Sequence, residues 1–304
     1  MRYLSFRDAA GRVRAGVSGS SDHDQSFRDV TDLLPGGDGS PMRRLIKAAE
    51  SSSDIKVLVS RAPVVDPASI VLLPVVPDPT KIVAAPVNYR NHQMEMNEAS
   101  HISSLGVFLK APSSVLGNGG VVRLPYNDRR FDQEGEFAAV IGRRARDVPE
   151  AEVLDYVFGY TCLLDMTMRG GEDRSVRKSF DTFTPVGPTI VAREDVPPVD
   201  ELELSLWVNG SLRQRADLKD LIWGVAKLIS YVSTVMTLYP GDIVTTGTPE
   251  GVGAVHDGDT IVVKVTGLDL LTVSVSAEGA GACPTLGAGQ GPKPPADLTP
   301  VSER

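Results

Sequence analysis

Two glutamates separated by a single residue precede an apolar run in the segment RFDQEGEFAAVIG. Because residues i and i+2 of a strand point to the same side, Glu134 and Glu136 share one face and Gly135 lies on the other. The segment LLDMTMR places Asp165 on a second β-rich run. Three carboxylates from two strands can therefore converge, and such a cluster repels itself unless it is protonated or neutralised by a cation.

The residue types of this cluster favour a hard metal ion. Carboxylate oxygens suit Mg²⁺, Mn²⁺ or Ca²⁺ rather than Zn²⁺. Taken alone, an E-x-E pattern is more typical of two exposed glutamates on a half-buried strand. The metal interpretation therefore depends on the neighbouring motifs.

Two further motifs carry groups for proton transfer and charge stabilisation. The segment NYRNHQMEMN holds His92 and Glu95 three residues apart, a spacing that brings a carboxylate beside an imidazole on one helical turn. A histidine oriented in this way can take a proton from water near neutral pH. The segment RKSFDTFTPVGP places Lys178 near Phe180 and Phe183, where a partly desolvated ammonium could hold a substrate carboxylate or a developing negative charge. Each motif alone is more typical of a surface residue.

A glycine-rich segment, TTGTPEGVG, follows a predicted strand near the end of the β-rich region. It lacks the Lys-Ser/Thr pair of a P-loop, and no helix follows it at once. Nucleotide phosphate binding is therefore not predicted. Its glycines would instead let the backbone approach a ligand, with Thr248 as a hydroxyl donor.

The elements that must position these groups are mostly short strands. From Lys81 to about Ser276, β-rich runs are separated by turns of Gly, Pro, Asn and Asp. One helix is predicted from Asp217 or Asp220 to Tyr239, because apolar residues recur there at three- and four-residue spacing before a Pro-Gly pair.

The two ends of the chain differ from this β-rich region. Residues 1–34 predict a strand pair around an Ala-Gly turn, and residues 41–52 predict a helix. We therefore expect a small N-terminal α+β domain over residues 1–75 and a catalytic domain over residues 76–277. The tail, residues 278–304, has too few large apolar groups to offset its ordering entropy and is expected to be disordered.

The composition of the 304 residues, 41% hydrophobic and 23% charged, is that of an ordinary globular protein. A net charge of -8 leaves no basic stripe to neutralise the phosphates of a nucleic acid. No segment reaches the roughly 20 apolar residues of a membrane span, and the two cysteines suggest no disulfide framework. We therefore expect a soluble cytoplasmic protein that binds neither nucleic acid nor membrane.

Six segments, taken in order, resemble the signature blocks of the fumarylacetoacetate hydrolase family, in particular its branch of 2-hydroxyhepta-2,4-diene-1,7-dioate isomerases and acylpyruvases. They are NYRNHQMEMN, VFLKAPSSVLGNGG, FDQEGEFAAVIG, GYTCLLDMTMR, RKSFDTFTPVGP and YPGDIVTTGTPEGVG. The resemblance implies a mainly β fold with some α, a mixed β-sandwich roll, and a homodimer. It covers about two thirds of the chain.

The resemblance also implies three groups of site residues. A divalent cation, Mg²⁺ or Mn²⁺ with Ca²⁺ as a further candidate, would be held by carboxylates beside a catalytic base and a cationic side chain. The expected metal ligands are Glu134, Glu136 and Asp165, the expected catalytic residues are His92, Glu95 and Lys178, and the expected substrate-binding residues are Tyr89, Arg169 and Thr248.

The activity that the resemblance implies is hydrolysis of a carbon–carbon bond in a 2,4-dioxo acid or related 1,3-dicarbonyl compound, in the catabolism of aromatic compounds or sugar acids. Isomerisation or decarboxylation of a 2-oxo acid on the same site is the alternative, and a non-catalytic metal- or ligand-binding protein is a third reading.

The sequence departs from the family pattern at two places near the expected site. Pro86 and Val87 precede Asn88, where many members have glycine, and M-R-G at residues 168–170 replaces the usual A-R-D. Arg169 stays in register, but the following segment GGEDRSVR is expected to shape substrate choice differently.

Overall fold

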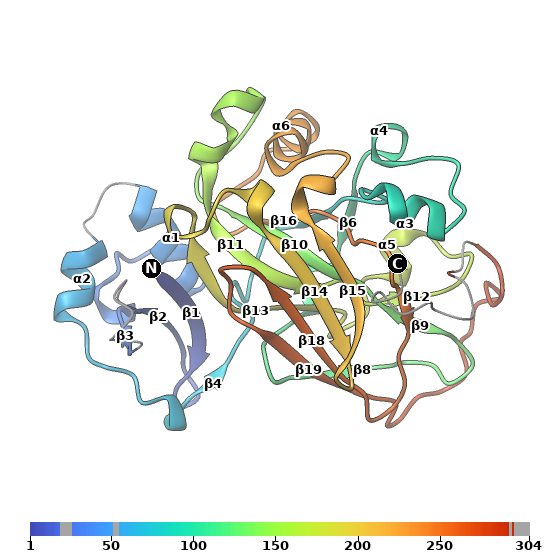
Figure 1. Ribbon diagram of the computed structural model, residues 1–304. Helices are drawn as coiled ribbons and strands as arrows, with labels where there is room; N and C mark the ends of the chain where they lie inside the picture. The colour runs from blue at the N-terminus through green and yellow to red at the C-terminus, as the bar shows by residue number, and fades with distance from the viewer. Residues whose placement is uncertain (19–25, 51–54, 292–293, 295–304) are drawn as a thin grey trace.

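The computed structural model describes residues 1–18, 26–50, 55–291 and 294. Its architecture is mainly β, with strands gathered into three sheets and short helices along their edges (Figure 1). This confirms the predicted fold class. Within the described residues, no helix has both the length and the apolar character needed to cross a bilayer.

The largest sheet has eleven strands and runs through both the N-terminal and the catalytic parts of the chain. Its strands, in spatial order, are β3 (Phe27–Asp29), β2 (Val13–Ser18), β1 (Arg2–Arg7), β13 (Thr184–Ala192), β11 (Val157–Leu164), β10 (Gly135–Ile141), β16 (Ile243–Thr245), β5 (Ile82–Ala84) and β6 (Phe108–Lys110), with β4 (Val71–Leu72) paired to β1 and β7 (Val115–Leu116) paired to β13.

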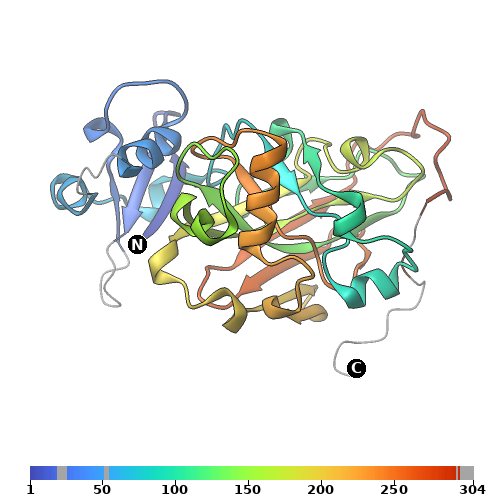
Figure 2. The same cartoon turned by 90° about the horizontal axis from the view of Figure 1, so that it is seen from above.

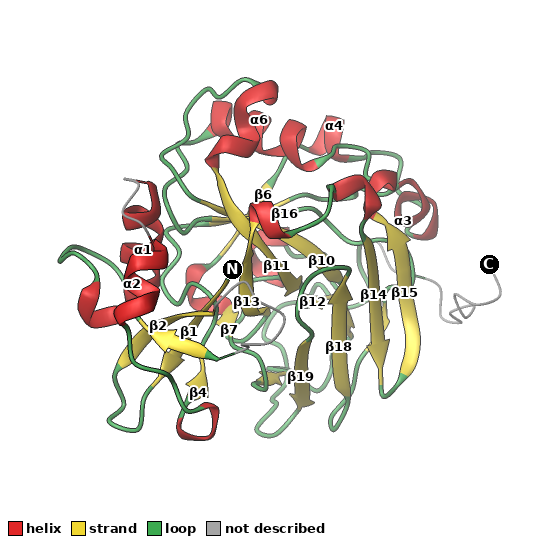
Figure 3. Cartoon of the chain, turned by 60° about the vertical axis from the view of Figure 1, so that its left-hand side comes forward, coloured by secondary structure: helices red, strands yellow, loops and turns green. Residues whose placement is uncertain are grey.

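A five-stranded sheet packs against β10, β11 and β13 of the larger sheet (Figure 3). Its order is β15 (Ser211–Asp217), β14 (Glu203–Val208), β18 (Thr260–Val265), β19 (Leu271–Ser276) and β8 (Val121–Arg123). The third sheet consists of β12 (Thr167–Met168), β9 (Phe131–Gln133) and β17 (Gly253–Ala254).

Strand β10 is buried along its whole length because both of its faces are covered. Phe137 and Ile141 belong to the apolar cluster shared with the five-stranded sheet, whereas Ala138 and Val140 belong to a second cluster shared with the N-terminal region. Burial on both faces explains why this strand reads as a continuous apolar run rather than an alternating one.

The N-terminal hairpin forms as predicted, with Tyr3 opposite Val17 in the pairing of β1 and β2. The α-helix α1 (Pro41–Glu50) covers this hairpin with buried apolar side chains, and α2 (Ile55–Arg61) follows it. Because β1 pairs with β13, one sheet crosses the expected boundary near residue 75. The N-terminal region therefore extends the catalytic sheet as well as adding helices of its own.

Helix α6 (Val225–Val235) is shorter than predicted and packs on the 3-10 helix Glu150–Tyr156 (Figure 2). The predicted start at Asp217 or Asp220 is wrong, because β15 continues to Asp217 and a 3-10 turn, Leu218–Asp220, follows it. The amide of Leu218 bonds to the carbonyl of Leu202, so this segment is tied to the rest of the chain rather than to a helix.

Three short α-helices lie near the expected site: α3 (Arg90–Glu95), α4 (Ile102–Leu105) and α5 (Arg174–Arg177). The remaining helices are short 3-10 turns at chain bends. They are Thr31–Leu33, Pro67–Ser69, Pro112–Ser114, Arg193–Asp195 and Val199–Glu201.

Residues 278–291, expected to be disordered, follow a defined path across the catalytic part. Gly281 forms a β-bridge with Tyr126, and the carbonyl of Gly287 accepts a hydrogen bond from the amide of Gly171 at 3.0 Å. The expectation considered only apolar burial, whereas this segment is held through its polar groups. Beyond residue 291, the tail lies outside the described residues except for Pro294.

Candidate active site

The three acidic residues predicted from the sequence meet where two strands of the large sheet lie side by side. One carboxylate oxygen from each of Glu134, Glu136 and Asp165 lies within 4.8 Å of the others, and all three residues are buried. The amide of Asp165 donates to the carbonyl of Glu134 at 2.8 Å, which fixes the two chain segments relative to each other.

The glycine between the two glutamates packs closely against the five-stranded sheet. Gly135 faces the five-stranded sheet, where an added Cβ would lie 2.9 Å from Cδ1 of Leu206. Its amide donates to the side-chain oxygen of Gln214 at 2.8 Å. Because neighbouring residues of a strand point to opposite sides, both glutamates face away from the five-stranded sheet.

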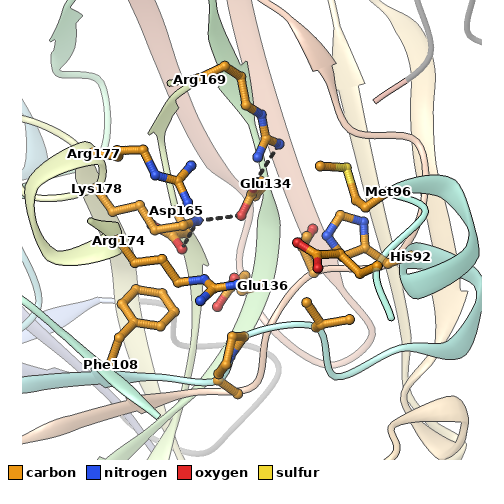
Figure 4. A pocket seen from close by; sticks show the side chains of 15 residues that line it. His92, Met96, Phe108, Glu134, Glu136, Asp165, Arg169, Arg174, Arg177 and Lys178 are labelled. Atoms are coloured by element: carbon orange, nitrogen blue, oxygen red, sulfur yellow. Dashed lines mark hydrogen bonds and ion pairs between the residues drawn. The ribbon is translucent and has the colours of Figure 1, made fainter. Parts of the chain in front are cut away.

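Lys178 contacts the carboxylate cluster directly. Its Nζ lies 2.6 Å from Oε2 of Glu134 and 2.6 Å from Oδ2 of Asp165 (Figure 4). It also donates to Oγ1 of Thr167 at 2.7 Å. The sequence predicted Phe180 and Phe183 as aromatic neighbours of this ammonium, whereas the ring that lies over Nζ is that of Phe108, whose centroid is 5.5 Å away.

A second lysine, which the sequence analysis did not select, lies behind the cluster. The side chain of Lys110 is 1% exposed, and its Nζ lies 2.5 Å from Oδ1 of Asp165 and 2.5 Å from the carbonyl oxygen of Lys178. Burial lowers its pKa, although the charge of Asp165 acts in the opposite direction. A lysine inside the apolar run VFLKA was the available signal, because a lysine is rarely fully buried without a partner.

Arg169 braces the other side of the cluster. Its Nε donates to Oδ2 of Asp132 at 2.6 Å and its Nη2 to Oε1 of Glu134 at 2.8 Å. Asp132 is fully buried and was also not selected from the sequence. Arg169 was predicted to bind substrate, and the structure shows that much of its donor capacity is used by these two carboxylates.

The two glutamates differ in their titration. Burial, followed by the charge of Asp165, raises the pKa of Glu136 to about 8. For Glu134, burial alone would raise the pKa, but the charges of Lys178 and Arg169 together hold it well below its usual range. The cluster thus favours a bound positive charge at Glu136, either a proton or a metal ion.

The donor set fits a divalent cation. Three buried carboxylates converge within 4.8 Å, and all of their ligand atoms are oxygens, which hard ions such as Mg²⁺ and Mn²⁺ prefer. Glu136 is further oriented by the amide of Gly247, which donates to its Oε2 at 3.1 Å, and by the hydroxyl of Thr245. Such bonds hold a ligand carboxylate in place.

The predicted His92–Glu95 pair forms on α3. Nδ1 of His92 lies 3.1 Å from Oε2 of Glu95, and the other carboxylate oxygen accepts a hydrogen bond from the amide of Gly251 at 2.9 Å. Gly251 has a positive φ of 94°, and an added Cβ would collide with the backbone of Arg213. Because Nδ1 faces Glu95, Nε2 is the ring nitrogen available to a water molecule in the pocket.

The start of α3 is anchored by one buried side chain. The amide group of Asn88 donates to the carbonyls of Trp223 and Thr246, both at 2.9 Å, and its oxygen accepts from the amide of Trp223 at 2.8 Å. These bonds tie the segment that carries His92 to the strand and loop beneath it.

The carboxylate cluster, Lys178 and His92 line one small pocket with a cavity volume of about 40 Å³. Seven of the nine residues predicted for the site line this pocket. An eighth, Glu95, is hydrogen-bonded to His92, which lines it. Thr248 lines the pocket, but its hydroxyl donates to the carbonyl of Gly135 at 2.9 Å.

Tyr89 lies apart from the other predicted residues. It is 2% exposed and borders a separate depression with Arg215 and Asp220. Its buried hydroxyl has no hydrogen-bond partner among the described residues. This side chain therefore does not line the pocket that contains the carboxylate cluster.

Comparison with known proteins agrees with this geometry. Residues 81–276 match the family model described as fumarylacetoacetate (FAA) hydrolase C-terminal. The chain belongs to the fumarylacetoacetate hydrolase family, a class of enzymes, and this confirms the resemblance found in the sequence.

Similar proteins within the family differ in the reactions that their names state. Over 232 residues the chain is 44% identical to a maleylpyruvate hydrolase of Aquipseudomonas alcaligenes, covering 73% of this chain and 81% of that protein. Over 197 residues it is 44% identical to a mitochondrial oxaloacetate tautomerase of Arabidopsis thaliana, covering 62% of this chain and 87% of that protein.

A solved structure gives a likeness over most of the fold. Maleylpyruvate hydrolase from Sphingobium sp. SYK-6, in complex with a manganese(II) ion and pyruvate, superposes with a TM-score of 0.78 at 37% identity. The match covers 91% of this chain and 99% of that one.

Proposed function

We propose that this protein is a divalent-metal-dependent hydrolase that cleaves a carbon–carbon bond of a 2,4-dioxo acid. The observation that carries the proposal is the His92–Glu95 hydrogen bond beside a pocket that holds three convergent carboxylates. Hydrolysis needs stabilisation of the enolate and also a base that takes a proton from the attacking water. The similarity to two maleylpyruvate hydrolases supports the same reaction.

In this reaction, Nε2 of His92 takes a proton from a water molecule whose oxygen adds to the C4 carbonyl of the substrate. The C3–C4 bond then breaks, and its electron pair stays on C3 as an enolate. The protonated imidazole returns its proton to C3, so one water is consumed and the products are a carboxylic acid and a 2-oxo acid.

The surrounding residues have separate tasks. Glu95 holds the imidazole and stabilises its protonated form. A divalent ion held by Glu134, Glu136 and Asp165 would supply Lewis-acid stabilisation of the departing enolate. Lys178, buried against two of these carboxylates, adds positive charge beside the forming oxyanion.

A panel of 2-oxo and 2,4-dioxo acids, with the products identified by mass, tests this proposal. Cleavage of a 2,4-dioxo acid in the presence of Mg²⁺ or Mn²⁺ supports it, and His92→Ala should lower kcat by about 10² to 10⁴ with a smaller change in KM. Glu95→Gln should give a milder defect of the same kind. A raised KM with unchanged kcat in His92→Ala would mean that this residue binds substrate instead.

Isomerisation is the second candidate, favoured by the similarity to an oxaloacetate tautomerase. The same base would then move a proton without consuming water, as it would in a keto–enol conversion. Decarboxylation of a 2-oxo acid would also use enolate stabilisation, but it needs no base to activate water. The same panel separates hydrolysis, which yields two acids, from decarboxylation, which releases carbon dioxide. Isomerisation leaves the mass unchanged and is recognised by a change in the enol absorbance of the compound.

The proposal extends to a homodimer that acts in the cytoplasm with Mg²⁺ or Mn²⁺, as the family resemblance implies. A solution mass near twice the 32.4 kDa of the chain would support the dimer, and a mass equal to that of one chain would contradict it.

A further inference from the structure

The segment of residues 278–291 carries a cysteine that the proposed reaction does not use. Cys283 is half-buried, and its amide donates to Oδ1 of Asp128 at 2.9 Å. Its Sγ lies 3.1 Å from Oγ1 of Thr285. The segment follows residues 81–276, which the family model matches, so Cys283 lies outside the domain that defines the family.

Arg129 lies beside this thiol and has donors that are not used. Its side chain is 1% exposed, and its Nη2 lies 3.0 Å from Oγ1 of Thr285 and 3.3 Å from Oε1 of Glu172. The side chain of Cys283 has the largest influence on the pKa of Arg129, which it raises. Nε and Nη1, by contrast, have no hydrogen-bond partner among the described residues. Buried donors of this kind are unfavourable until an acceptor is placed beside them.

The surroundings of Cys283 favour its thiolate. Burial acts to raise the pKa of the thiol, but the contacts with Thr285 and Arg129 outweigh it and hold this pKa below its ordinary value. The thiolate is the reactive form of cysteine, and partly exposed thiolates beside a cation react most readily. Cys162 differs in both respects, because it is buried in the core and burial raises its pKa to about 12.

The segment that carries Cys283 is packed on the loop that leads to α5. The amide of Gly171 donates to the carbonyl of Gly287 at 3.0 Å, and a Cβ added to Gly171 would lie 2.8 Å from Oε1 of Gln290. The carboxylate of Glu172 accepts a hydrogen bond from the hydroxyl of Thr285. Because Thr285 joins the two chain segments and also contacts Sγ, a bulky group on the sulfur would displace this joint.

We propose that Cys283 is a modification site, at which hydrogen peroxide oxidises the thiolate and a low-molecular-weight thiol such as glutathione then forms a mixed disulfide. The added group releases residues 281–291 from the loop before α5. The inference does not depend on which reaction the carboxylate pocket catalyses.

The chemistry has two steps. First, the thiolate attacks one oxygen of the peroxide, the O–O bond breaks, hydroxide leaves, and the sulfur is oxidised by two electrons to a sulfenic acid. The new oxygen is an acceptor for the unused donors of Arg129. Second, the thiolate of glutathione attacks the sulfenic sulfur, so that an S–S bond forms, the S–O bond breaks and hydroxide leaves.

Trapping of the sulfenic acid with dimedone, followed by peptide mass analysis, tests the first step. Peroxide treatment should lead to label at Cys283 and not at Cys162. Arg129→Met should slow the labelling by about 5- to 10-fold, because loss of the neighbouring cation raises the pKa of the thiol by up to about one unit. Glu172→Gln breaks contacts with the same segment but removes a negative charge, so it should not slow the labelling.

The pair of variants separates charge from loosening of the segment, since loosening alone would expose the thiol and speed the labelling in both. Labelling of Arg129→Met at the wild-type rate or faster, or absence of label at Cys283, would overturn the inference. Should Arg129→Met fail to fold, Arg129→Lys decides the question, because it keeps the charge and should keep most of the rate.

Hydrogen exchange tests the release of the segment. The protein that carries one glutathione should exchange faster over residues 169–173 and 281–291 than the reduced protein, and dithiothreitol should restore the original protection. Cys283→Ser, treated with peroxide and glutathione in the same way, should show no change. Equal exchange in the modified and reduced proteins would contradict the release.

Discussion

At the scale of single residues, the site is a balance of buried charges. Lys178 and Arg169 hold Glu134 in its charged form, whereas Glu136 has a pKa raised to about 8. A bound cation therefore stabilises the charged form of Glu136 more than that of Glu134. Substitution of Glu136 is accordingly the most direct test of metal binding.

Glu136→Gln should abolish tight metal binding without destabilising the metal-free protein. The amide removes one of three oxygen ligands and its charge, which should weaken Mn²⁺ by at least about 100-fold. It also removes a buried carboxylate whose ionisation is unfavourable, so the unfolding temperature of the metal-free protein should not fall. Calorimetry and thermal denaturation measure both effects. Glu98→Gln, in the same pocket but outside the cluster, should keep Mn²⁺ affinity, and an equal loss there would contradict the assignment.

Metal binding should release a proton at neutral pH. A raised pKa means that Glu136 keeps its proton in the metal-free protein up to about pH 8, whereas a metal ligand must be deprotonated. Apparent affinity should therefore rise with pH, approaching tenfold per unit below about pH 8, and level off above it. Titration at pH 7 in two buffers of different ionisation enthalpy counts the released proton. A release of zero would show that Glu136 is already charged.

The sequence predicted the residues whose pattern is local. Glu134, Glu136 and the His92–Glu95 pair follow from strand and helix periodicity, and the structure brings them together. Lys110 and Asp132 do not follow from periodicity, because each acts through a partner distant in the chain. For Lys110, its place inside the apolar run VFLKA was the local signal.

At the scale of elements, the segment that carries His92 is short and joined to the body at few points. Helix α3 has six residues, and it is held by Asn88 at its start and by the hydrogen bond that the amide of Gly251 donates to Glu95. Between it and α4, most residues are exposed or half-buried. The strands around the site were predicted correctly because turn residues separate them in the chain. The predicted helix was longer than α6 because hydrophobic periodicity takes no account of the backbone pairing of the preceding residues.

Hydrogen exchange over residues 91–101 should slow when Mn²⁺ and a 2-oxo acid such as pyruvate are bound. A segment with few anchors opens easily, and contacts to a ligand would add to its protection. Exchange in β10, which is buried on both faces, should not change and serves as the internal control. Equal protection of residues 91–101 in both states would rule out a closing segment.

The residue 278–291 segment should matter for catalysis through the loop before α5. Thr285 donates to Glu172 and accepts a hydrogen bond from Arg129 at 3.0 Å. Thr285→Val removes about 1 kcal/mol of hydrogen bonding, which should lower kcat/KM by up to about fivefold with little change in unfolding temperature. Thr234→Val, which removes an exposed hydroxyl on α6, is the matched control. A loss of stability without a loss of kcat/KM would assign the segment a purely structural role.

At the scale of the whole molecule, family resemblance predicted the architecture and the local pattern alone did not. Short β-rich runs indicate strands, but their order in the sheets depends on pairings such as β1 with β13, which join residues nearly 190 positions apart. The same long-range pairing explains why the N-terminal region shares an apolar cluster with β10 and β11.

The central claim is that water attacks the C4 carbonyl of a 2,4-dioxo acid, and the label of that water tests it most directly. The reaction is run with succinylpyruvate and Mn²⁺ in water enriched in oxygen-18, and both products are analysed by mass. The account predicts pyruvate together with succinate that carries one oxygen-18 in the carboxylate formed by cleavage. Recovery of the substrate uncleaved, or release of carbon dioxide without succinate, would contradict it.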